Sequence, residues 1–359
     1  MPVQDLGGLV VDLPHLDLVL TVAGELRQDL TFGRPDELPD LRLARVPVSA
    51  DVPESAFVDP EQLDLVLAQL RRWCAARFGG WTPEMGKDRP LENIFALGHP
   101  KSLGALVAEP ADAPSTTSAL ANAGAGVRVT MLDVRLDVDL AAASGAEVPQ
   151  VAGHGRFVKG VIGGLAPGAH VSVRPVLDAG GRGNTWDVVR ALAAAVREDQ
   201  AQVVNLSIGC RTADGEPPFV LRRAVEVLGE QTLIVAAAGN RWADPAVAQR
   251  SQPTWPATLP GVVAVGAAAA EFSPQLPWVD YLAPGVDIVS TFLSDVATKE
   301  QPLATFHGFA KWSGTSFAAA HLTGAVAAAL PSSGSARAAL ADLASTEGSG
   351  ITRYRWQEV

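Results

Sequence analysis

From residue 127 onward, short continuous runs of apolar residues alternate with longer stretches of helical periodicity. The apolar runs have the length and the Val, Ile and Leu content of buried strands. We expect strands at 127–132, 169–176, 202–207, 232–237 and 261–265, and helices that begin at 157 and span 186–197 and 219–228. Apolar strands that alternate with helices indicate an α/β fold whose mostly parallel sheet is covered on both faces. Binding and catalytic side chains then collect at the carboxyl ends of the strands.

The first 110 residues carry a different pattern, with β-like runs at 8–13, 16–22 and 41–48. Residues 61–78 have apolar positions at 63, 65, 66, 67, 70, 73 and 74 and end at two glycines, as in an amphipathic helix with a C-cap. This half therefore predicts a small α+β N-terminal unit, 1–110, of accessory or prodomain-like type. The Ala-, Pro-, Ser-, Thr- and Gly-rich composition of 109–126 indicates a connector. We place a linker at 111–126 and a second domain at 127–359.

The formal charge of -11, with no run rich in Lys and Arg, argues against nucleic acid as a partner. The first residues contain no basic, then apolar, secretory leader, and no later segment resembles a membrane span, so we expect a cytoplasmic protein. Cys74 and Cys210 have neither metal-site nor disulfide spacing. We predict no metal and no cofactor, and the sequence does not indicate the oligomeric state. Because 109–126 has no basic pair, we favour a permanent N-terminal module over a cleaved prodomain.

The stretch WSGTSFAAAHLTGAVAAAL, residues 312–330, presents one serine from a glycine-rich turn and continues as an apolar, Ala-rich helix. The helix is too apolar for a surface and, at about 14 residues, too short for a bilayer, so it predicts a buried helix. We expect Gly314 to permit a sharp entry and Ser316 to lie near the helix N-terminus, where amides favour negative charge. Ser316 is a candidate nucleophile; the alternative is an ordinary N-cap.

A serine hydroxyl needs a base, a group that orients the base and donors for the oxyanion. Of six histidines, only His154 lies in a Gly-His-Gly turn just before a predicted helix, so it is the candidate base. His321 follows Ser316 by five residues on the same helix and is expected to face elsewhere.

The orienting carboxylate is expected at a strand end. Asp133 directly follows the strand at 127–132, whereas Asp137 and Asp139 follow in a loop and are expected to be solvated. Asn240 ends the run LIVAAAGN, where its amide could stabilise an oxyanion. The alternative for Asn240 is an ordinary Gly-Asn turn.

The order aspartate, histidine, serine is that of subtilisin. Over 127–330 the chain resembles the subtilisin-like serine peptidases (subtilases, S8-type). The resemblance rests on GHGRFVKGVIGGLAPGAHV (153–171), VVNLSIG (203–209), LIVAAAGN (233–240), WPATLPGVVAVGA (255–267), YLAPGVDIVST (281–291) and GTSFAAAH (314–321). It implies a three-layer fold with a mostly parallel central sheet.

The resemblance also implies roles for individual residues. Ser316 would be the nucleophile, His154 the general base and acid, and Asp133 the carboxylate that fixes the histidine tautomer. Asn240 would form the oxyanion hole with the Ser316 amide.

A peptide substrate would lie between two backbone segments and above a floor of small residues. The matching residues are Gly181, Arg182 and Gly183 on one wall, Ser207, Ile208 and Gly209 on the other, and Ala237, Ala238 and Gly239 on the floor of the first pocket. The small floor and Ile208 predict an open, apolar pocket for the residue before the scissile bond. Arg182 at the rim would favour a nearby acidic side chain.

The chain departs from the family pattern beside the aspartate, at Val134 and Arg135, and beside the histidine, at Arg156 and Lys159. The first hypothesis is a serine endopeptidase that acts on proteins or peptides in the cell. These departures motivate a second, a degenerate domain that binds a peptide without cleaving it. A third hypothesis is a peptide-processing or macrocyclising enzyme, in which an amine resolves the acyl-enzyme.

Overall fold

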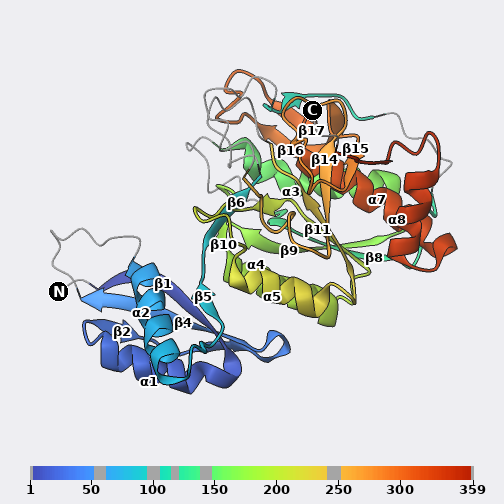
Figure 1. Cartoon of the computed structure of the whole chain (residues 1–359). Coiled ribbons are helices and arrows are strands. Elements are labelled where there is room, and N and C mark those ends of the chain that lie inside the picture. The colour runs from blue at the N-terminus through green and yellow to red at the C-terminus, as the bar shows by residue number, and fades with distance from the viewer. Residues whose placement is uncertain are drawn as a thin grey trace.

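The computed structural model describes residues 3–51, 62–94, 106–114, 121–137, 148–240 and 252–356. Two bodies of different size are visible in Figure 1, an N-terminal unit in blue and a larger unit that contains the rest of the chain. Part of the predicted linker, 115–120, lies outside the described residues. No helix of the described residues is long and apolar enough to cross a membrane.

The larger unit is built on a seven-stranded sheet among the described residues, in the order β18-β15-β14-β13-β11-β8-β9. All neighbouring pairs are parallel except β15 with β18. The strands are β8 (Arg128–Val134), β9 (His170–Leu177), β11 (Val203–Leu206), β13 (Leu233–Ala237), β14 (Val262–Ala267), β15 (Tyr281–Ala283) and β18 (Thr352–Arg353). The predicted α/β class with a mostly parallel central sheet is confirmed.

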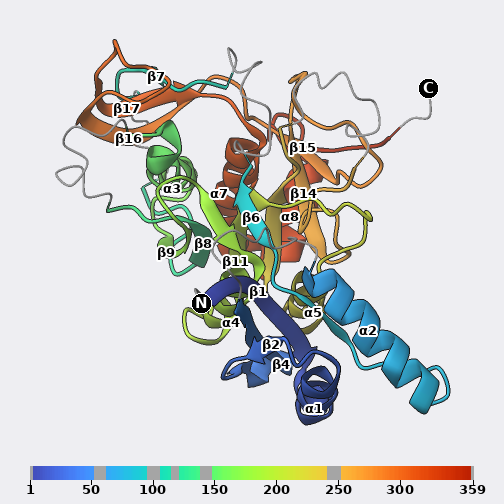
Figure 2. The same ribbon diagram turned by 90° about the vertical axis from the view of Figure 1, so that its left-hand side faces the viewer.

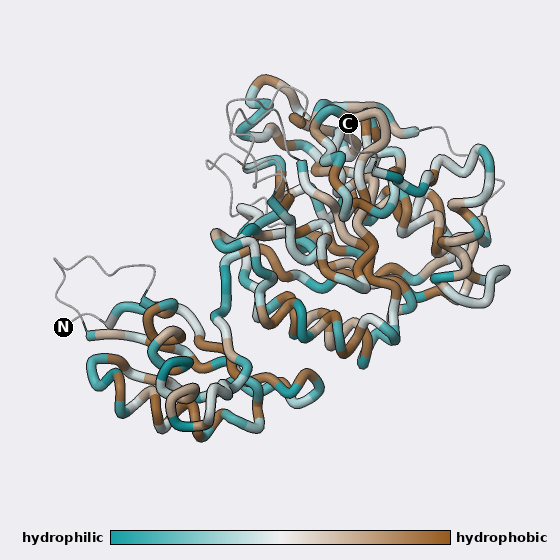
Figure 3. Tube along the Cα trace, in the orientation of Figure 1, coloured by the Kyte–Doolittle hydropathy of each residue, from teal (hydrophilic) through white to brown (hydrophobic). Residues whose placement is uncertain are grey.

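Helices cover both faces of this sheet, which gives three layers. One buried cluster joins Met131 and Val235 to α3 and α7, and a second joins Leu132 and Ile234 to α4 and α5. Successive strand residues therefore face opposite layers, which explains why the strands are apolar at consecutive positions. The helices are α3 (His154–Leu165), α4 (Thr185–Arg197), α5 (Phe219–Leu228), α7 (Thr315–Ser333) and α8 (Ala336–Ser345). Figure 3 shows hydrophobic residues concentrated inside the larger unit.

Two small antiparallel sheets flank the main sheet, and each includes a strand from the first 110 residues. One has the order β10-β6-β12 and the other β16-β17-β7. The strands are β6 (Pro90–Asn93), β7 (Glu109–Pro110), β10 (Arg182–Asn184), β12 (Ile208–Gly209), β16 (Ile288–Val296) and β17 (Phe306–Trp312). The N-terminal part of the chain thus contributes backbone pairing to the larger unit.

The N-terminal unit packs a sheet of the order β2-β4-β1-β5, with β3 beside β4, against α1 and α2. The strands are β1 (Val3–Asp12), β2 (Leu30–Phe32), β3 (Asp36–Leu38), β4 (Leu43–Asp51) and β5 (Met85–Lys87). The helices are α1 (Leu16–Leu26) and α2 (Gln62–Arg77), and short 3-10 turns span Leu13–His15, Pro39–Leu41 and Gln150–Gly153.

The prediction of a strand at 16–22 is wrong, because these residues lie in α1. The buried side chains of α1 are Leu16, Val19, Val22 and Ala23, a spacing of three and four residues that forms one helical face. The β-branched residues in this stretch suggested a strand, but burial of that face against the sheet favours the helix.

The N-terminal unit docks on α5 through paired charges. Arg223 lies 2.7 Å from the Asp12 carboxylate, Arg222 lies 2.7 Å from Glu84, and Arg223 also pairs with Glu84. The hydrogen bond from Arg222 lowers the pKa of the Glu84 carboxyl, with Arg223 adding to the effect against partial burial.

A second contact is made at the start of α4. The Asp88 carboxylate accepts hydrogen bonds from the backbone N–H of Trp186 (2.9 Å) and the Thr185 hydroxyl (3.0 Å). The first amides of a helix have no partner within the helix, so Asp88 satisfies a donor that would otherwise need water. Asp36 accepts from the Trp186 indole N–H at 2.8 Å.

Aromatic rings join α3, α7 and the second small sheet. The rings of Phe157 and Phe317 lie 4.3 Å apart, and the Trp312 ring lies 5.7 Å from Phe157 and 5.8 Å from Phe292. All four residues are at most 2% exposed.

We expect Phe157→Ala to lower the free energy of unfolding by about 3–5 kcal/mol, because the variant leaves a cavity among rings that cannot close it. Leu303→Ala, at a fully exposed position, is the control and should change it by less than about 0.5 kcal/mol. Denaturant unfolding in a Ser316→Ala background, which removes the candidate nucleophile, measures both. Equal effects of the two variants would contradict the packing described for Phe157.

Replacing Glu84 tests the charged contact with α5. Because the folded-state pKa of Glu84 is lowered, its contribution is complete above the ordinary carboxyl pKa and is lost as pH falls through the folded value. Since Glu84 is half exposed, we expect Glu84→Gln to cost only about 0.5–1 kcal/mol near neutral pH, and progressively less as the pH falls. Glu226→Gln, which removes another Arg222 partner but one within α5, is the matched control. A Glu84 effect that does not depend on pH would contradict the electrostatic origin.

Candidate active site

Asp133 and His154 come together where the end of β8 meets the start of α3. Nδ1 of His154 lies 2.8 Å and 3.0 Å from the two carboxylate oxygens of Asp133, and both residues are fully buried. The Val134 backbone N–H also donates to Asp133, at 2.7 Å. A buried carboxylate needs such partners, and these two hold its position and that of the ring.

The glycines on either side of His154 allow this approach. A Cβ atom on Gly155 would lie 2.6 Å from the Val134 carbonyl oxygen, and one on Gly153 would lie 2.3 Å from the Phe292 ring. Any larger residue at these two positions would push α3 away from β8 or from the aromatic cluster.

Ser316 lies at the second position of α7 and is fully buried. The His154 ring lies 5.8 Å from the Trp312 ring and 5.7 Å from the Phe317 ring, so residues on both sides of Ser316 contact the imidazole. The Ser316 hydroxyl has no hydrogen-bond partner within the described part of the chain. Gly314 has a φ of 169°, an extended conformation open to any residue, so its torsion is not what requires glycine at the helix entry.

Asn240 follows β13 and contacts the same helix end. Its side-chain oxygen accepts hydrogen bonds from the Thr315 backbone N–H (2.9 Å) and hydroxyl (3.0 Å). The Gly239 N–H donates to the Thr315 hydroxyl at 3.1 Å. Because the side-chain oxygen of Asn240 accepts both hydrogen bonds from Thr315, its amide nitrogen points away from Thr315. This nitrogen is buried and has no partner among the described residues. A buried donor of this kind is suited to a transient negative charge.

Sequence reasoning assigned no role to Thr315, which sits between Asn240 and Ser316 in this network. Thr315 is part of the motif GTSFAAAH, and its position directly before the candidate nucleophile could have indicated a role in the site. A second polar link holds the neighbouring wall, where Asn205 donates to the Ser207 hydroxyl (3.2 Å) and accepts from Thr323 of α7 (3.1 Å).

The two predicted walls of the substrate cleft are held apart by another strand. Gly181 and Ser207 do not pair with each other; their carbonyl oxygens accept from the backbone N–H groups of Asn93 (2.7 Å) and Ile94 (3.4 Å). Figure 2 shows β6, in cyan, leaving the N-terminal unit and entering the larger one. The other residues predicted to line the cleft lie on β10, on β12, or at and just after the end of β13. Arg182 and Gly183 are at least partly exposed. The buried ones are Ile208, Gly209, Ala237, Ala238 and Gly239.

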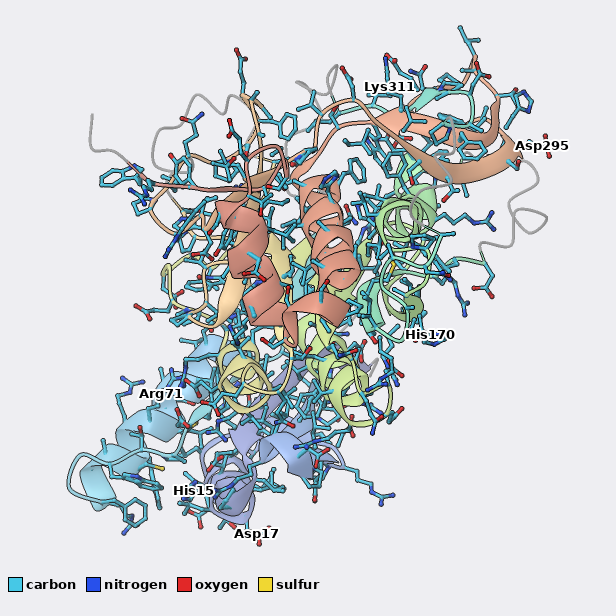
Figure 4. All side chains as sticks on the ribbon, turned by 90° about the vertical axis from the view of Figure 1, so that its right-hand side faces the viewer. His15, Asp17, Arg71, His170, Asp295 and Lys311 are labelled. Carbon is cyan, nitrogen blue, oxygen red and sulfur yellow. The ribbon has the colours of Figure 1, made fainter. Side chains whose placement is uncertain are left out.

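The other described histidines, His15, His170, His307 and His321, lie elsewhere, and His99 lies outside the described residues. Figure 4 labels His15 in the N-terminal unit and His170 at the first residue of β9, at the amino-terminal ends of the strands, whereas Asp133 lies at the carboxyl end of β8. His321 lies within α7, and burial lowers the pKa of its imidazole. Burial raises the pKa of the Cys210 thiol to about 12, so this cysteine is protonated and a poor nucleophile at neutral pH.

Two of the cations that depart from the family pattern, Arg156 and Arg135, have partners in the loop after β8. Arg156 donates to the Leu136 carbonyl oxygen at 2.7 Å, and the exposed Arg135 lies 3.7 Å from Asp137. Asp139 lies outside the described residues. Among the residues that the structure describes, no group of three His, Cys, Asp or Glu side chains could hold a metal ion.

The comparisons with known proteins agree with this architecture. The solved structure of fervidolysin from Fervidobacterium pennivorans, a keratinolytic enzyme related to subtilisin, matches 92% of this chain and 55% of its own, with a TM-score of 0.61 and 18% identity, which shows the fold. A thermophilic serine proteinase of Bacillus sp. (strain AK1) is 34% identical over 197 residues, which are 50% of this chain and 43% of that protein. Subtilisin BL of Lederbergia lenta is 32% identical over 228 residues, 57% of this chain and 76% of that protein.

The chain thus spans less than half the length of the first relative and about three quarters of the second. The sequence model of the Subtilase family (Peptidase_S8) matches residues 141–340. This match covers more than half of the chain, and the chain belongs to the subtilase family.

Proposed function

We propose that the chain is a serine endopeptidase that hydrolyses peptide bonds through Asp133, His154 and Ser316. The proposal rests on the buried pair of Asp133 and His154. The His154 ring contacts the rings of Trp312 and Phe317, which precede and follow Ser316 in the chain. The buried amide nitrogen of Asn240 at the same helix end supports it. Membership of the subtilase family, whose curated relatives here are proteases, adds a further reason.

The reaction uses these groups in sequence. Ser316 Oγ attacks the carbonyl carbon of the scissile bond while its proton passes to His154 Nε2. The carbonyl oxygen gains the negative charge and is stabilised by the amide of Asn240 and the backbone N–H of Ser316. His154 then gives the proton to the leaving amine as the C–N bond breaks, and water, activated by the same base, releases the acid from Ser316. Asp133 keeps Nδ1 protonated throughout.

We further propose that the N-terminal unit is prodomain-like, in place of the permanent module that the sequence of 109–126 favoured. The chain is divided into this unit (1–110), a linker (111–126) and the peptidase domain (127–359), and β6 of the first lies between the proposed substrate walls of the last. The full burial of Ser316 in the intact chain supports a latent state. Residues 106–110 contact the peptidase domain, since the Leu106 carbonyl accepts from the Trp312 indole at 2.7 Å and β7 pairs with β17.

Two alternatives differ in their observable products. A domain that only binds peptides was suggested by Arg156, whose guanidinium donates to the loop at Leu136. A ligating enzyme would join the acyl group to an amine rather than to water. Mass spectrometry of products separates the three, because hydrolysis adds a water, ligation does not, and a binder yields no product.

We expect a fluorophosphonate probe to label the wild-type chain as it becomes active and not to label Ser316→Ala. Peptide hydrolysis should fall by at least about 1,000-fold in the variant, because only oxyanion stabilisation and binding remain. Ser313→Ala, a buried serine three residues earlier, is the matched control and should be labelled. Labelling of Ser316→Ala would exclude Ser316 as the nucleophile.

Asn240→Ala should lower kcat by about 100- to 1,000-fold with little change in KM, the range measured for the corresponding donor in subtilisin. The reason is that the donor acts on charge that appears only in the transition state. Asn122→Ala, at an exposed turn, should leave both constants unchanged. The kinetics are measured per cleaved chain, quantified by intact mass; a rise in KM with normal kcat would assign Asn240 to substrate binding instead.

A further inference from the structure

The chain places one of its own sequences where a substrate would lie. β6 is the middle strand between β10 and β12 and is antiparallel to both. Glu92 is paired with Arg182 on one side and with Gly209 on the other. Pairing on both edges is the way an extended peptide is held by backbone groups, with its side chains directed into pockets.

We propose that residues 91–94, Leu-Glu-Asn-Ile, are the chain's own substrate sequence and that they define the preference of its cleft. The peptidase would select Ile directly before the scissile bond, Asn at the second position and Leu at the fourth, and would tolerate variation at the third. The first bond cut would be the one on the carboxyl side of Ile94. This inference rests on the proposed function, since it assigns the specificity of the same site.

The backbone contacts set the register. The Asn93 N–H is held by Gly181 on one wall and the Ile94 N–H by Ser207 on the other. β6 ends at Asn93, so the carbonyl of Ile94 is the first peptide group beyond the paired residues. The wall that holds Ile94 is tied through Asn205 to Thr323 of α7, the helix that carries Ser316.

The two apolar positions are enclosed. Ile94 is fully buried, in the apolar cluster that also contains Ala237 and Phe317. Leu91 is 2% exposed and belongs to the cluster of Leu177 on the other side of the sheet. A charged side chain at either position would lose its hydration without a compensating partner, so both pockets select apolar residues.

The two polar positions differ from each other. Asn93 is fully buried beside Gly181, where an added methyl group would lie 3.1 Å from the Asn93 Cβ and 2.9 Å from Val151. A small pocket that encloses an amide rejects a carboxylate, whose burial costs more. Glu92 is partly exposed and lies opposite Arg182, but the described structure contains no ion pair between the two, so the acidic preference expected from Arg182 is not assigned to this position, which imposes little selection.

The test is a competition in one tube. The wild-type chain is incubated with four peptides that copy residues 87–98, carrying the parent sequence or Ile94→Asp, Asn93→Asp or Glu92→Gln, and initial rates are read by mass spectrometry. Rate ratios among competing substrates do not depend on the fraction of active enzyme. We expect cleavage after Ile in the parent, a loss of about 100-fold or more for Ile94→Asp and Asn93→Asp, and a change within about threefold for Glu92→Gln. Ser316→Ala is the blank.

The intact mass of the chain itself gives a second readout. The wild type should release a fragment of residues 1–94, and Ser316→Ala should not. Fluorophosphonate labelling with equal cleavage of all four peptides, or with a first cut at another bond, overturns the inference and leaves the proposed function standing. Absence of labelling and of any cleavage overturns the proposed function, and the inference with it.

Discussion

The hydrogen bond between the Asp133 carboxylate and Nδ1 of His154 is the interaction on which the rest of the candidate site depends. Both groups are fully buried, and a buried carboxylate is tolerable only when its oxygens are satisfied. The Val134 N–H and the imidazole supply those partners. The need for these partners fixes the positions of both side chains. The carboxylate cannot move without losing a hydrogen-bond donor, and the imidazole ring cannot turn without leaving the carboxylate unsatisfied.

That constraint extends to the layers of the fold. β8, between β11 and β9, delivers the carboxylate and α3 delivers the ring, so α3 must lie close to both the sheet and α7. Small residues make this possible: a Cβ on Gly324 of α7 would lie 3.0 Å from the Leu165 Cβ and 3.1 Å from the Ile162 carbonyl oxygen of α3. The Ala- and Gly-rich composition of α7 is thus required by close packing as well as by burial.

The sequence predicted the elements whose signal is local. Strands buried on both faces are apolar throughout, and a nucleophile between a glycine-rich turn and a buried helix is visible in the residues themselves. Two features had no such signal. The residues of α1 contain enough Val and Leu to suggest a strand. They form a helix because a helix buries Leu16, Val19, Val22 and Ala23 together against the sheet. β6, with the sequence PLEN, has no strand periodicity and begins with proline; it is a strand because β10 and β12 offer two unpaired edges.

The roles of Thr315 and Asn240 show the same limit. The amide of Asn240 is directed by two hydrogen bonds from a residue 75 positions away, and no pattern within LIVAAAGN indicates which atom of the side chain would remain available. The sequence shows that Thr315 and Asn240 are present, but the role proposed for each depends on contacts that only the folded structure reveals.

The placement of β6 also explains how the cleft is kept closed in the intact chain. A tethered strand competes with external peptides at an effective concentration of about millimolar, so modest contacts suffice while the chain is intact. Once the bond after Ile94 is cut, the tether is gone. The fragment is then held by its strand pairing, by apolar residues that share a buried cluster with α4 and α5, and by polar contacts with the same two helices. The charge pairs on α5 are partly exposed, which makes release sensitive to salt and pH. The charged contacts of the N-terminal unit thus lie at the solvent boundary, whereas Asn93 and Ile94 are buried in the core, as is the pair of Asp133 and His154.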